Sequence, residues 1–150
     1  MASRLQHILF ICTGNTCRSP MAEAILKNKK LADVEVMSAG IYAANGSEAS
    51  THAKQVLDNK QVPHKHRSQM VSSELVEWAD LILTMTSSHK FAIQQQFPQS
   101  VMKVFTLKEY TGETSNQDVV DPYGGSLAVY EETYDELEKL IDAAIEKFKP

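Results

Sequence analysis

Short apolar runs, separated by stretches with helical patterns, recur along this chain. Four of the runs are rich in β-branched and aromatic residues and predict strands. They are His7 to Cys12, Val34 to Ser38, Leu81 to Met85 and Met102 to Leu107. Because these runs are largely apolar and do not alternate with polar residues, they are typical of strands buried on both faces, as in a parallel sheet covered by helices.

Five further segments have helical patterns and lie between or after the strands. They run from about Pro20 to Leu31, Glu48 to Asn59, Ser73 to Trp78, Ser88 to Phe97, and Leu127 to Phe148. Pro20 suits a first helical turn, and Pro98 suits a helix stop. In the last segment apolar residues recur at spacings of four and three, which predicts one stripe packed against the sheet. Its members are Tyr130, Tyr134, Leu137, Ile141, Ala144 and Phe148.

Turn residues and polar stretches separate these elements. Asn45-Gly46 and Gly124-Gly125 mark turns, and Thr111 to Asp118 is polar and unpatterned, as expected of a mobile loop. There is no internal repeat, linker or low-complexity tract. At 150 residues the chain is long enough to bury one core, so residues 1–150 are predicted to form a single domain.

Strands that alternate with helices predict an α/β fold with a doubly wound, four-stranded parallel sheet and helices on both faces. In such sheets ligands bind at the carboxyl ends of the strands. Cys12, Ser38, Thr84 to Thr86 and the loop from Lys108 to Gly125 are therefore expected at one rim.

Composition excludes several classes of function. The net charge of −4 argues against sequence-independent nucleic-acid binding, which requires a basic face. Only two cysteines are present, so a secreted disulfide scaffold is not expected. Met1 to Gln6 lack the pattern of a signal peptide, and the first apolar run is too short to cross a bilayer. These features favour a cytoplasmic protein without a membrane partner.

The most informative segment is Cys12 to Pro20, where a thiol stands between a predicted strand and a predicted helix. Amides of such a turn and the positive end of the helix bind tetrahedral oxyanions, and the same field favours thiolate over thiol. Arg18 offers a planar fork of donors for two phosphate oxygens. A thiolate beside an anion cradle predicts cleavage of a phosphate ester or a phosphoramidate through Cys12.

Cys12 to Pro20, together with Asp121-Pro122-Tyr123, resembles the signature of the low-molecular-weight protein tyrosine phosphatases. The resemblance extends over essentially the whole chain and implies the strand order 2-1-3-4, a phosphate-binding loop after the first strand, and a metal-free and cofactor-free mechanism. Within that superfamily, Thr16 and the segments 105–110 and 121–126 are most similar to the bacterial protein-arginine phosphatases. The implied partners are phosphorylated proteins, with inorganic phosphate as product and the enzyme as a monomer.

Asp121 is the candidate general acid, because its loop leaves the last strand at the rim that holds Cys12. It would protonate the leaving atom and then deprotonate the attacking water. Asp118 competes for this role on sequence grounds, and the family pattern, with proline directly following, selects Asp121. Arg18 would stabilise the equatorial oxygens of the transition state.

The other candidate residues form the loop and its supports. Gly14 permits close approach of the backbone to the anion, and Asn15 suits a left-handed turn or a bracing side chain. The resemblance implies that Ser19 stabilises the Cys12 thiolate, and that Asn15, Ser38 and His64 brace the loop. A solvated position is an alternative for His64. The substrate-binding set is Thr13, Gly14, Asn15, Thr16, Cys17, Ser19 and Tyr123.

Three of these residues bear on specificity and regulation. Tyr123 can stack on a planar phenol or guanidinium, or simply pack in the fold. Tyrosine-specific relatives commonly carry a bulkier aliphatic residue where Thr16 stands, so the first choice of substrate is phosphoarginine and the alternative is phosphotyrosine. Cys17 either forms a protective disulfide with Cys12 under peroxide or packs in the loop.

Other functions of a cysteine loop are less consistent with the sequence. A non-catalytic phosphocysteine carrier would not require Arg18 or Asp121. An arsenate reductase on this fold needs further cysteines after Cys17, and a thioredoxin-like site needs two cysteines separated by two residues. The paired ligand spacing of a zinc site and the Gly-Lys-Ser/Thr motif of nucleotide-binding loops are both missing from the sequence.

Overall fold

A computed structural model describes residues 6–148 of the chain. Met1 to Leu5, where a signal peptide would begin, lie outside the described residues. The four strands are β1 (Gln6–Cys12), β2 (Val34–Gly40), β3 (Leu81–Thr84) and β4 (Val104–Thr106). They form one parallel sheet in the order β2-β1-β3-β4, as the sequence and its resemblance predict.

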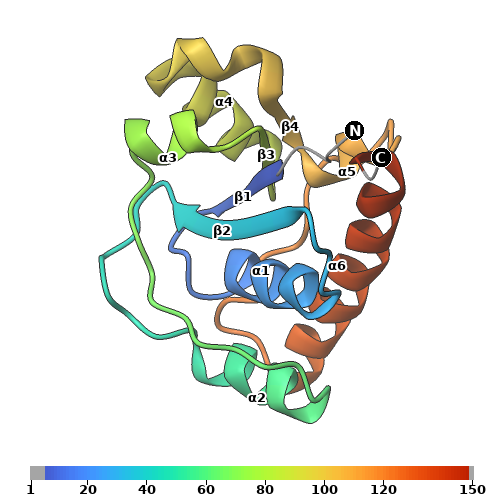
Figure 1. Ribbon diagram of the computed structural model, residues 1–150. Coiled ribbons are helices and arrows are strands. Elements are labelled where there is room, and N and C mark those ends of the chain that lie inside the picture. Colours follow the sequence, from blue (N-terminus) through green and yellow to red (C-terminus); the bar gives the residue numbers. More distant parts are fainter. Residues whose placement is uncertain (1–5, 149–150) are drawn as a thin grey trace.

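Helices cover both faces of this sheet (Figure 1). One face carries α1 (Arg18–Asn28) and α6 (Leu127–Phe148), with α2 (Thr51–Asn59) packed against α6. The other carries α3 (Ser73–Trp78) and α4 (Ser87–Gln96). The short α5 (Leu107–Tyr110) follows β4 directly and packs against α6. In the described part of the chain, no helix is long and apolar enough to cross a membrane.

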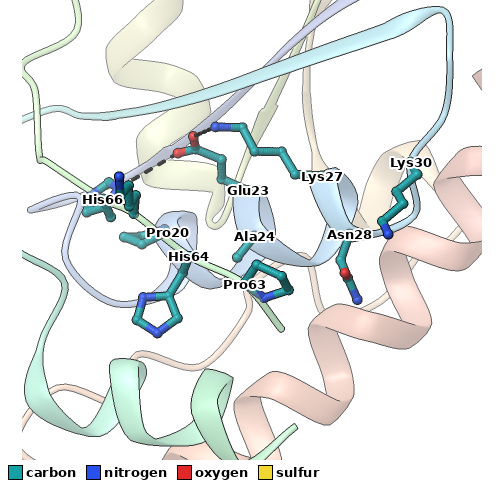
Figure 2. Close-up of a pocket in the computed structure, with 10 residues that line it drawn as sticks. Pro20, Glu23, Ala24, Lys27, Asn28, Lys30, Pro63, His64 and His66 are labelled. Carbon is teal, nitrogen blue, oxygen red and sulfur yellow. Dashed lines mark hydrogen bonds and ion pairs between the residues drawn. The ribbon is translucent and has the colours of Figure 1, made fainter. Parts of the chain in front are cut away.

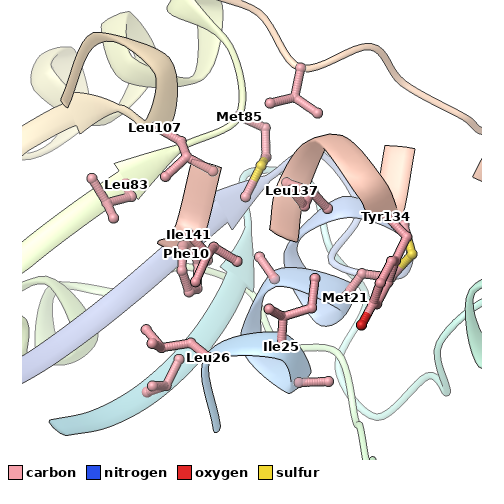
Figure 3. Close-up of a cluster of buried hydrophobic side chains, with 14 of the residues drawn as sticks. Phe10, Met21, Ile25, Leu26, Leu83, Met85, Leu107, Tyr134, Leu137 and Ile141 are labelled. Atoms are coloured by element: carbon pink, nitrogen blue, oxygen red, sulfur yellow. The ribbon is translucent and has the colours of Figure 1, made fainter. Parts of the chain in front are cut away.

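The central strand β1 divides the core into two clusters, because successive side chains of a strand point to opposite faces. Ile8 and Phe10 lie in the cluster under α1 and α6, and Cys12 belongs to the same face (Figure 3). Leu9 and Ile11 pack in the second cluster, on the side of α3 and α4. All six residues of the stripe predicted for the last helix are buried. The catalytic thiol candidate thus stands at the end of the central strand, after four consecutive buried residues.

Some element boundaries differ from those expected. Helix α1 begins at Arg18 and ends at Asn28, and the chain then reverses at Lys30, whose φ of 55° ends the helix. Helix α2 begins only at Thr51, because the Ser50 side chain caps it by accepting a hydrogen bond from the amide of Ala53 at 3.3 Å.

The fourth strand is shorter than the predicted run from Met102 to Leu107. Pro98–Lys103 forms a 3₁₀ helix, η1, and strand pairing begins at Val104. Lys103 is the last residue of η1, and its ammonium donates hydrogen bonds to the carbonyl oxygens of Val76 and Ala79. These bonds fix the position at which the chain enters β4. Helix α5 was not expected from the sequence. A capping box between Thr106 and Glu109 initiates it.

Candidate active site

The loop of residues 13–17 joins β1 to α1 at the carboxyl end of the sheet. Asn15 adopts a left-handed conformation with φ of 57°, which turns the chain back toward the helix. Neighbouring segments bind the carbonyls of the loop. The Tyr42 amide donates to the Thr13 oxygen at 3.0 Å, and the Ser50 amide donates to the Thr16 oxygen at 2.8 Å. Residues outside the loop therefore fix its position by donating hydrogen bonds to its carbonyl oxygens.

The backbone amides of the same loop donate no hydrogen bond within the protein. For each residue from Thr13 to Cys17, the amide N–H has no acceptor among residues 6–148. Uncommitted amides at the positive end of a helix are the donors that cradle a tetrahedral oxyanion. The backbone of this loop therefore fits a phosphoryl group.

Arg18 adds a guanidinium to this cradle. The residue is 4% exposed, and its Nη1 donates to the carbonyl oxygen of Val119 at 3.1 Å. Its Nη2 lies 3.6 Å from a carboxylate oxygen of Asp121, and its buried Nε has no partner within the described part of the chain. A buried donor without an acceptor is costly unless a ligand meets it. An anion beside Nε would satisfy it.

Cys12 lies at the base of the loop, and its sulfur is 2.8 Å from the Ser19 hydroxyl oxygen. The Asn15 amide group donates to that same oxygen at 2.8 Å. Because this bond occupies a lone pair of Ser19, the hydroxyl proton is free to point at the sulfur. Ser19 is thus arranged to donate to a thiolate at Cys12, a residue that is only 3% exposed.

A buried polar network supports Asn15 from behind. Its side-chain nitrogen also donates to Ser38 at 2.9 Å, and its side-chain oxygen accepts from the Gln69 amide at 3.0 Å. The Ser38 hydroxyl donates in turn to Glu23 on α1. These bonds anchor the left-handed residue to strand β2 and to helix α1, as predicted for Asn15 and Ser38.

The histidine in this network is His66, and the assignment to His64 is wrong. His66 places its Nε2 2.6 Å from the carbonyl oxygen of Asn15, so the ring donates there. His64 instead bonds to Asp58 at 2.8 Å, away from the loop. The two histidines are two positions apart in an irregular segment, where sequence spacing does not indicate which side chain points inward.

Glu23 joins this network to Lys27 (Figure 2). Burial by itself would raise the pKa of Glu23, but hydrogen bonds with His66, Lys27 and Ser38 lower it overall. The carboxylate therefore stays ionised behind the loop at neutral pH. The Lys27 ammonium lies 2.6 Å from one of its oxygens.

The structure separates the two aspartates that compete for the role of general acid. One oxygen of Asp118 accepts from the Ser87 amide at 2.9 Å, so this side chain is used at the start of α4. The Asp121 side chain is 52% exposed, faces Arg18, and accepts from the Tyr123 amide at 3.0 Å. Only Asp121 has a carboxylate beside the buried guanidinium.

The remaining predicted residues lie around the loop. Tyr123 is 78% exposed and so is free to meet a substrate. Thr16 is half-buried, and a Cβ built on Gly14 would lie 3.8 Å from its hydroxyl oxygen. The Cys17 sulfur lies 3.3 Å from the Tyr130 hydroxyl oxygen and 3.6 Å from that of Ser50. Both cysteines are free thiols.

Besides His66 and Glu23, sequence reasoning missed Gly40 and His89, which also support the loop. A Cβ on Gly40 would lie 2.5 Å from the carbonyl oxygen of Thr13, so only glycine lets the end of β2 approach this closely. His89, on α4, places its Nε2 2.8 Å from the Thr13 hydroxyl oxygen. Burial, followed by the charge of Arg18, lowers the pKa of His89 to about 4. His89 is therefore neutral at pH 7.

No group of three or more His, Cys, Asp or Glu residues suited to hold a metal ion occurs among residues 6–148. The chemistry that this site supports depends on the thiol, the guanidinium, the carboxylate and the loop amides. These groups are those that phosphoryl transfer through a cysteine requires.

The family model of the low molecular weight phosphotyrosine protein phosphatases matches residues 7–149. The chain belongs to this family. It is therefore a cysteine-dependent phosphatase. Cys12 ends the first strand, directly before the loop that the family resemblance predicts there.

Relatives in this family carry two kinds of name. The chain is 53% identical to a protein-arginine-phosphatase of Geobacillus stearothermophilus over 142 residues, or 95% of each chain. It is 47% identical to a protein-arginine-phosphatase of Bacillus subtilis, over 95% of this chain and 96% of that one. It is also 40% identical to the low molecular weight protein-tyrosine-phosphatase PtpB of Staphylococcus epidermidis, over 95% of this chain and 97% of the relative.

Solved structures agree with this membership. The YwlE arginine phosphatase from Geobacillus stearothermophilus superposes with a TM-score of 0.93 at 51% identity, covering 96% of this chain and 93% of that one. A cysteine-to-serine mutant of YwlE arginine phosphatase, described with a phosphorylated active-site serine, superposes with a TM-score of 0.90 at 45% identity over 96% of both chains.

Proposed function

We propose that this phosphatase hydrolyses phosphoarginine in proteins through a cysteinyl-phosphate intermediate. The observation that carries the proposal is the half-exposed Asp121 carboxylate, held 3.6 Å from the buried Arg18 guanidinium at the mouth of a loop with free amides. A carboxylate in this position faces the group that leaves the phosphorus. It can bind a guanidinium there by a charge-assisted hydrogen bond.

In the first step the Cys12 thiolate attacks phosphorus in line while the bond from phosphorus to the guanidinium nitrogen breaks. Asp121 in its protonated form gives the leaving nitrogen the proton that it needs and becomes the carboxylate that acts in the second step. The free loop amides and the Arg18 guanidinium stabilise the charge on the equatorial oxygens, where it spreads in the transition state. The Arg18 Nε, which has no other acceptor in the described chain, and its neighbouring Nη match two of those oxygens.

In the second step water attacks phosphorus as the sulfur–phosphorus bond breaks. Asp121 takes the proton of the water, and inorganic phosphate leaves. The sulfur departs as a thiolate that accepts the Ser19 hydroxyl proton as a hydrogen bond across their 2.8 Å contact. The network through Asn15 keeps Ser19 in position, so the same contact serves both attack and departure.

Two features favour phosphoarginine over phosphotyrosine as the substrate. Thr16 is small and polar, so this position offers no aliphatic side chain to a phenol ring. The two relatives of 53% and 47% identity are named protein-arginine-phosphatases. Phosphotyrosine remains the second candidate, because relatives near 40% identity are named protein-tyrosine-phosphatases.

The deciding experiment compares phosphoarginine and phosphotyrosine in peptides of the same sequence. We expect the wild type to release phosphate faster from the phosphoarginine peptide, and Thr16→Ile to reverse the preference. Thr16→Ser serves as the control, since it keeps a small hydroxyl. A wild type that turns over only the phosphotyrosine peptide would show that the arginine assignment is wrong while leaving the phosphatase chemistry intact.

The covalent step has its own test. We expect Cys12→Ser to abolish turnover and still to bind a phosphate analogue, because the nucleophile and the anion cradle are separate parts of the site. Binding measured by isothermal titration with vanadate checks the cradle. Retained turnover in this variant would contradict the proposed nucleophile.

We further propose that the enzyme works as a cytoplasmic monomer on phosphorylated proteins and binds no nucleic acid. The net charge of −4 supports the last point. Reversible oxidation that joins Cys12 to Cys17 is also part of the proposal. Both thiols are free and near the loop, as a redox-sensitive pair requires.

A further inference from the structure

A cavity of about 550 Å³ lies beside the catalytic loop, between helix α1 and the irregular segment 63–66. It is separate from the mouth of the loop, because none of the residues from Cys12 to Arg18 lines it. In Figure 2 the segment 63–66 runs alongside α1, with Pro63 next to Ala24. This volume lies within the range of pockets that hold small molecules.

The lining combines an apolar base with a cationic rim. Pro20 and Ala24 are buried at the base, and Pro63 lies across from them on the irregular segment. The rim carries the exposed lysines Lys30 and Lys65, and neither has an ion pair within residues 6–148. Two free ammonium groups beside flat apolar surface match a ligand that has a flat apolar body and an acidic group.

The carboxylate of the lining does not cancel this positive charge. Glu23 is already paired with Lys27 at 2.6 Å and bonded to Ser38. His64, which also lines the cavity, is bonded to Asp58 at 2.8 Å. The unpaired charges at the rim are therefore both positive, on a chain whose net charge is −4. Such a local patch attracts anions.

We propose that this cavity binds a small aromatic anion and that its occupancy is coupled to the catalytic loop. The class is an aryl carboxylate, sulfonate or phosphate, with its ring against Pro20, Ala24 and Pro63 and its acid against one of the two rim lysines, Lys30 or Lys65. The proposal concerns a site outside the reaction centre. It holds whichever phosphorylated residue the enzyme hydrolyses.

The coupling follows from two residues that belong both to the cavity and to the loop network. His66 lines the cavity and donates to the Asn15 carbonyl at 2.6 Å. Glu23 lines the cavity and accepts from Ser38, which in turn holds Asn15. A ligand that shifts either side chain changes the support of Asn15. By linkage, the loop's affinity for phosphate must then change with occupancy of the cavity.

The test uses 8-anilinonaphthalene-1-sulfonate, an aromatic anion whose fluorescence rises in apolar surroundings. We expect the folded wild type to bind this probe. Saturating inorganic phosphate, which fills the catalytic loop, should change the probe's dissociation constant by a finite factor equal to the coupling, and should not compete with the probe. The double variant Lys30→Glu/Lys65→Glu should bind the probe about tenfold more weakly, because it reverses both partly solvated rim charges, either of which can contact the sulfonate. Thermal melts of each variant verify that it is folded.

The matched control is Lys139→Glu, which reverses an exposed lysine of α6 outside the cavity lining. Its probe affinity should equal that of the wild type. Competitive displacement of the probe, with an apparent dissociation constant that keeps rising as phosphate is added beyond saturation of the loop, would overturn the site. Equal affinity in the double variant and the wild type would also overturn it. Coupling is measured as the inhibition constant of phosphate in the turnover assay. A shift of at least twofold at saturating probe supports coupling, and an unchanged constant would overturn it.

Discussion

Gly40 offers the sharpest test of how the fold shapes the catalytic loop. The residue ends strand β2, and a Cβ at this position would lie 2.5 Å from the carbonyl oxygen of Thr13 and 3.0 Å from the amide nitrogen of Asn15. Both atoms belong to the backbone of the loop and cannot rotate away. The Gly40→Ala variant must therefore move the loop, the strand or both.

The size of the effect follows from these distances. An ordinary van der Waals contact begins near 3.4 Å, so the Thr13 oxygen and the new methyl group must separate by about 0.9 Å. A misplacement of about 1 Å costs on the order of 100-fold in rate when it shifts groups that position a reacting atom. We expect kcat/KM of Gly40→Ala to fall by about 10-fold to 100-fold, and stability to fall by about 1–3 kcal/mol from overpacking.

The assay is steady-state turnover of a small phosphate ester, with urea unfolding to measure stability. Gly112→Ala is the control, because Gly112 has φ of 100° and a Cβ added there would have no heavy atom within 4 Å. It should lose stability through backbone strain and keep its turnover. A folded Gly40→Ala enzyme with the wild-type kcat/KM would refute the argument that this glycine sets the position of the loop.

Three further predictions concern the site. Asp121→Asn should lower kcat by about 100-fold or more, which is within the range for general acid–base catalysis. Asp118→Asn should mainly weaken the start of α4. Equal losses of kcat in the two variants would contradict the assignment. Because the pKa of His89 is about 4 in the fold and its ordinary value is 6.5, the unfolded chain binds more protons between these values. The free energy of unfolding should therefore fall by at most about 2 kcal/mol between pH 6.5 and pH 4.5. The fall should be smaller in His89→Gln. Urea unfolding at both pH values measures it. Cys17→Ala should lower the fraction of activity that dithiothreitol restores after peroxide, because a Cys12 sulfenic acid with no partner thiol is oxidised further to the irreversible sulfinic acid. A restored fraction equal to that of the wild type would exclude a protective disulfide between Cys12 and Cys17.

The repetitive parts of the fold were predictable because their signals are local. Continuous apolar runs indicate strands buried on both faces, and the spacing of Tyr130, Leu137 and Phe148 gave both the length and the buried face of α6. The motif from Cys12 to Pro20 likewise placed the thiol, the guanidinium and the helix start within nine residues. Neighbours in sequence determine these features, so no knowledge of distant contacts is needed.

The predictions that failed concern features that depend on contacts between segments far apart in the sequence. The shortened β4 depends on Lys103 bonding to carbonyls near the end of α3, about 25 positions earlier in the chain. His66 rather than His64 contacts Asn15 because the segment 63–67 crosses α1 in one particular register. Sequence periodicity carries no information about the register of an irregular segment.

The sequence by itself determined that a cysteine and an arginine share one anion-binding turn, because five intervening residues and a following helix leave little conformational choice. The tertiary structure alone decided which glycine makes room for that turn, and it supplied the physical reason for the family pattern's choice of Asp121 over Asp118. Asp118 and Asp121 differ by three positions, and only the packing of their loop against Ser87 and Arg18 separates their roles. Likewise, Gly40 matters only because β2 ends against the Thr13 carbonyl, a contact between segments 27 positions apart that the folded sheet creates.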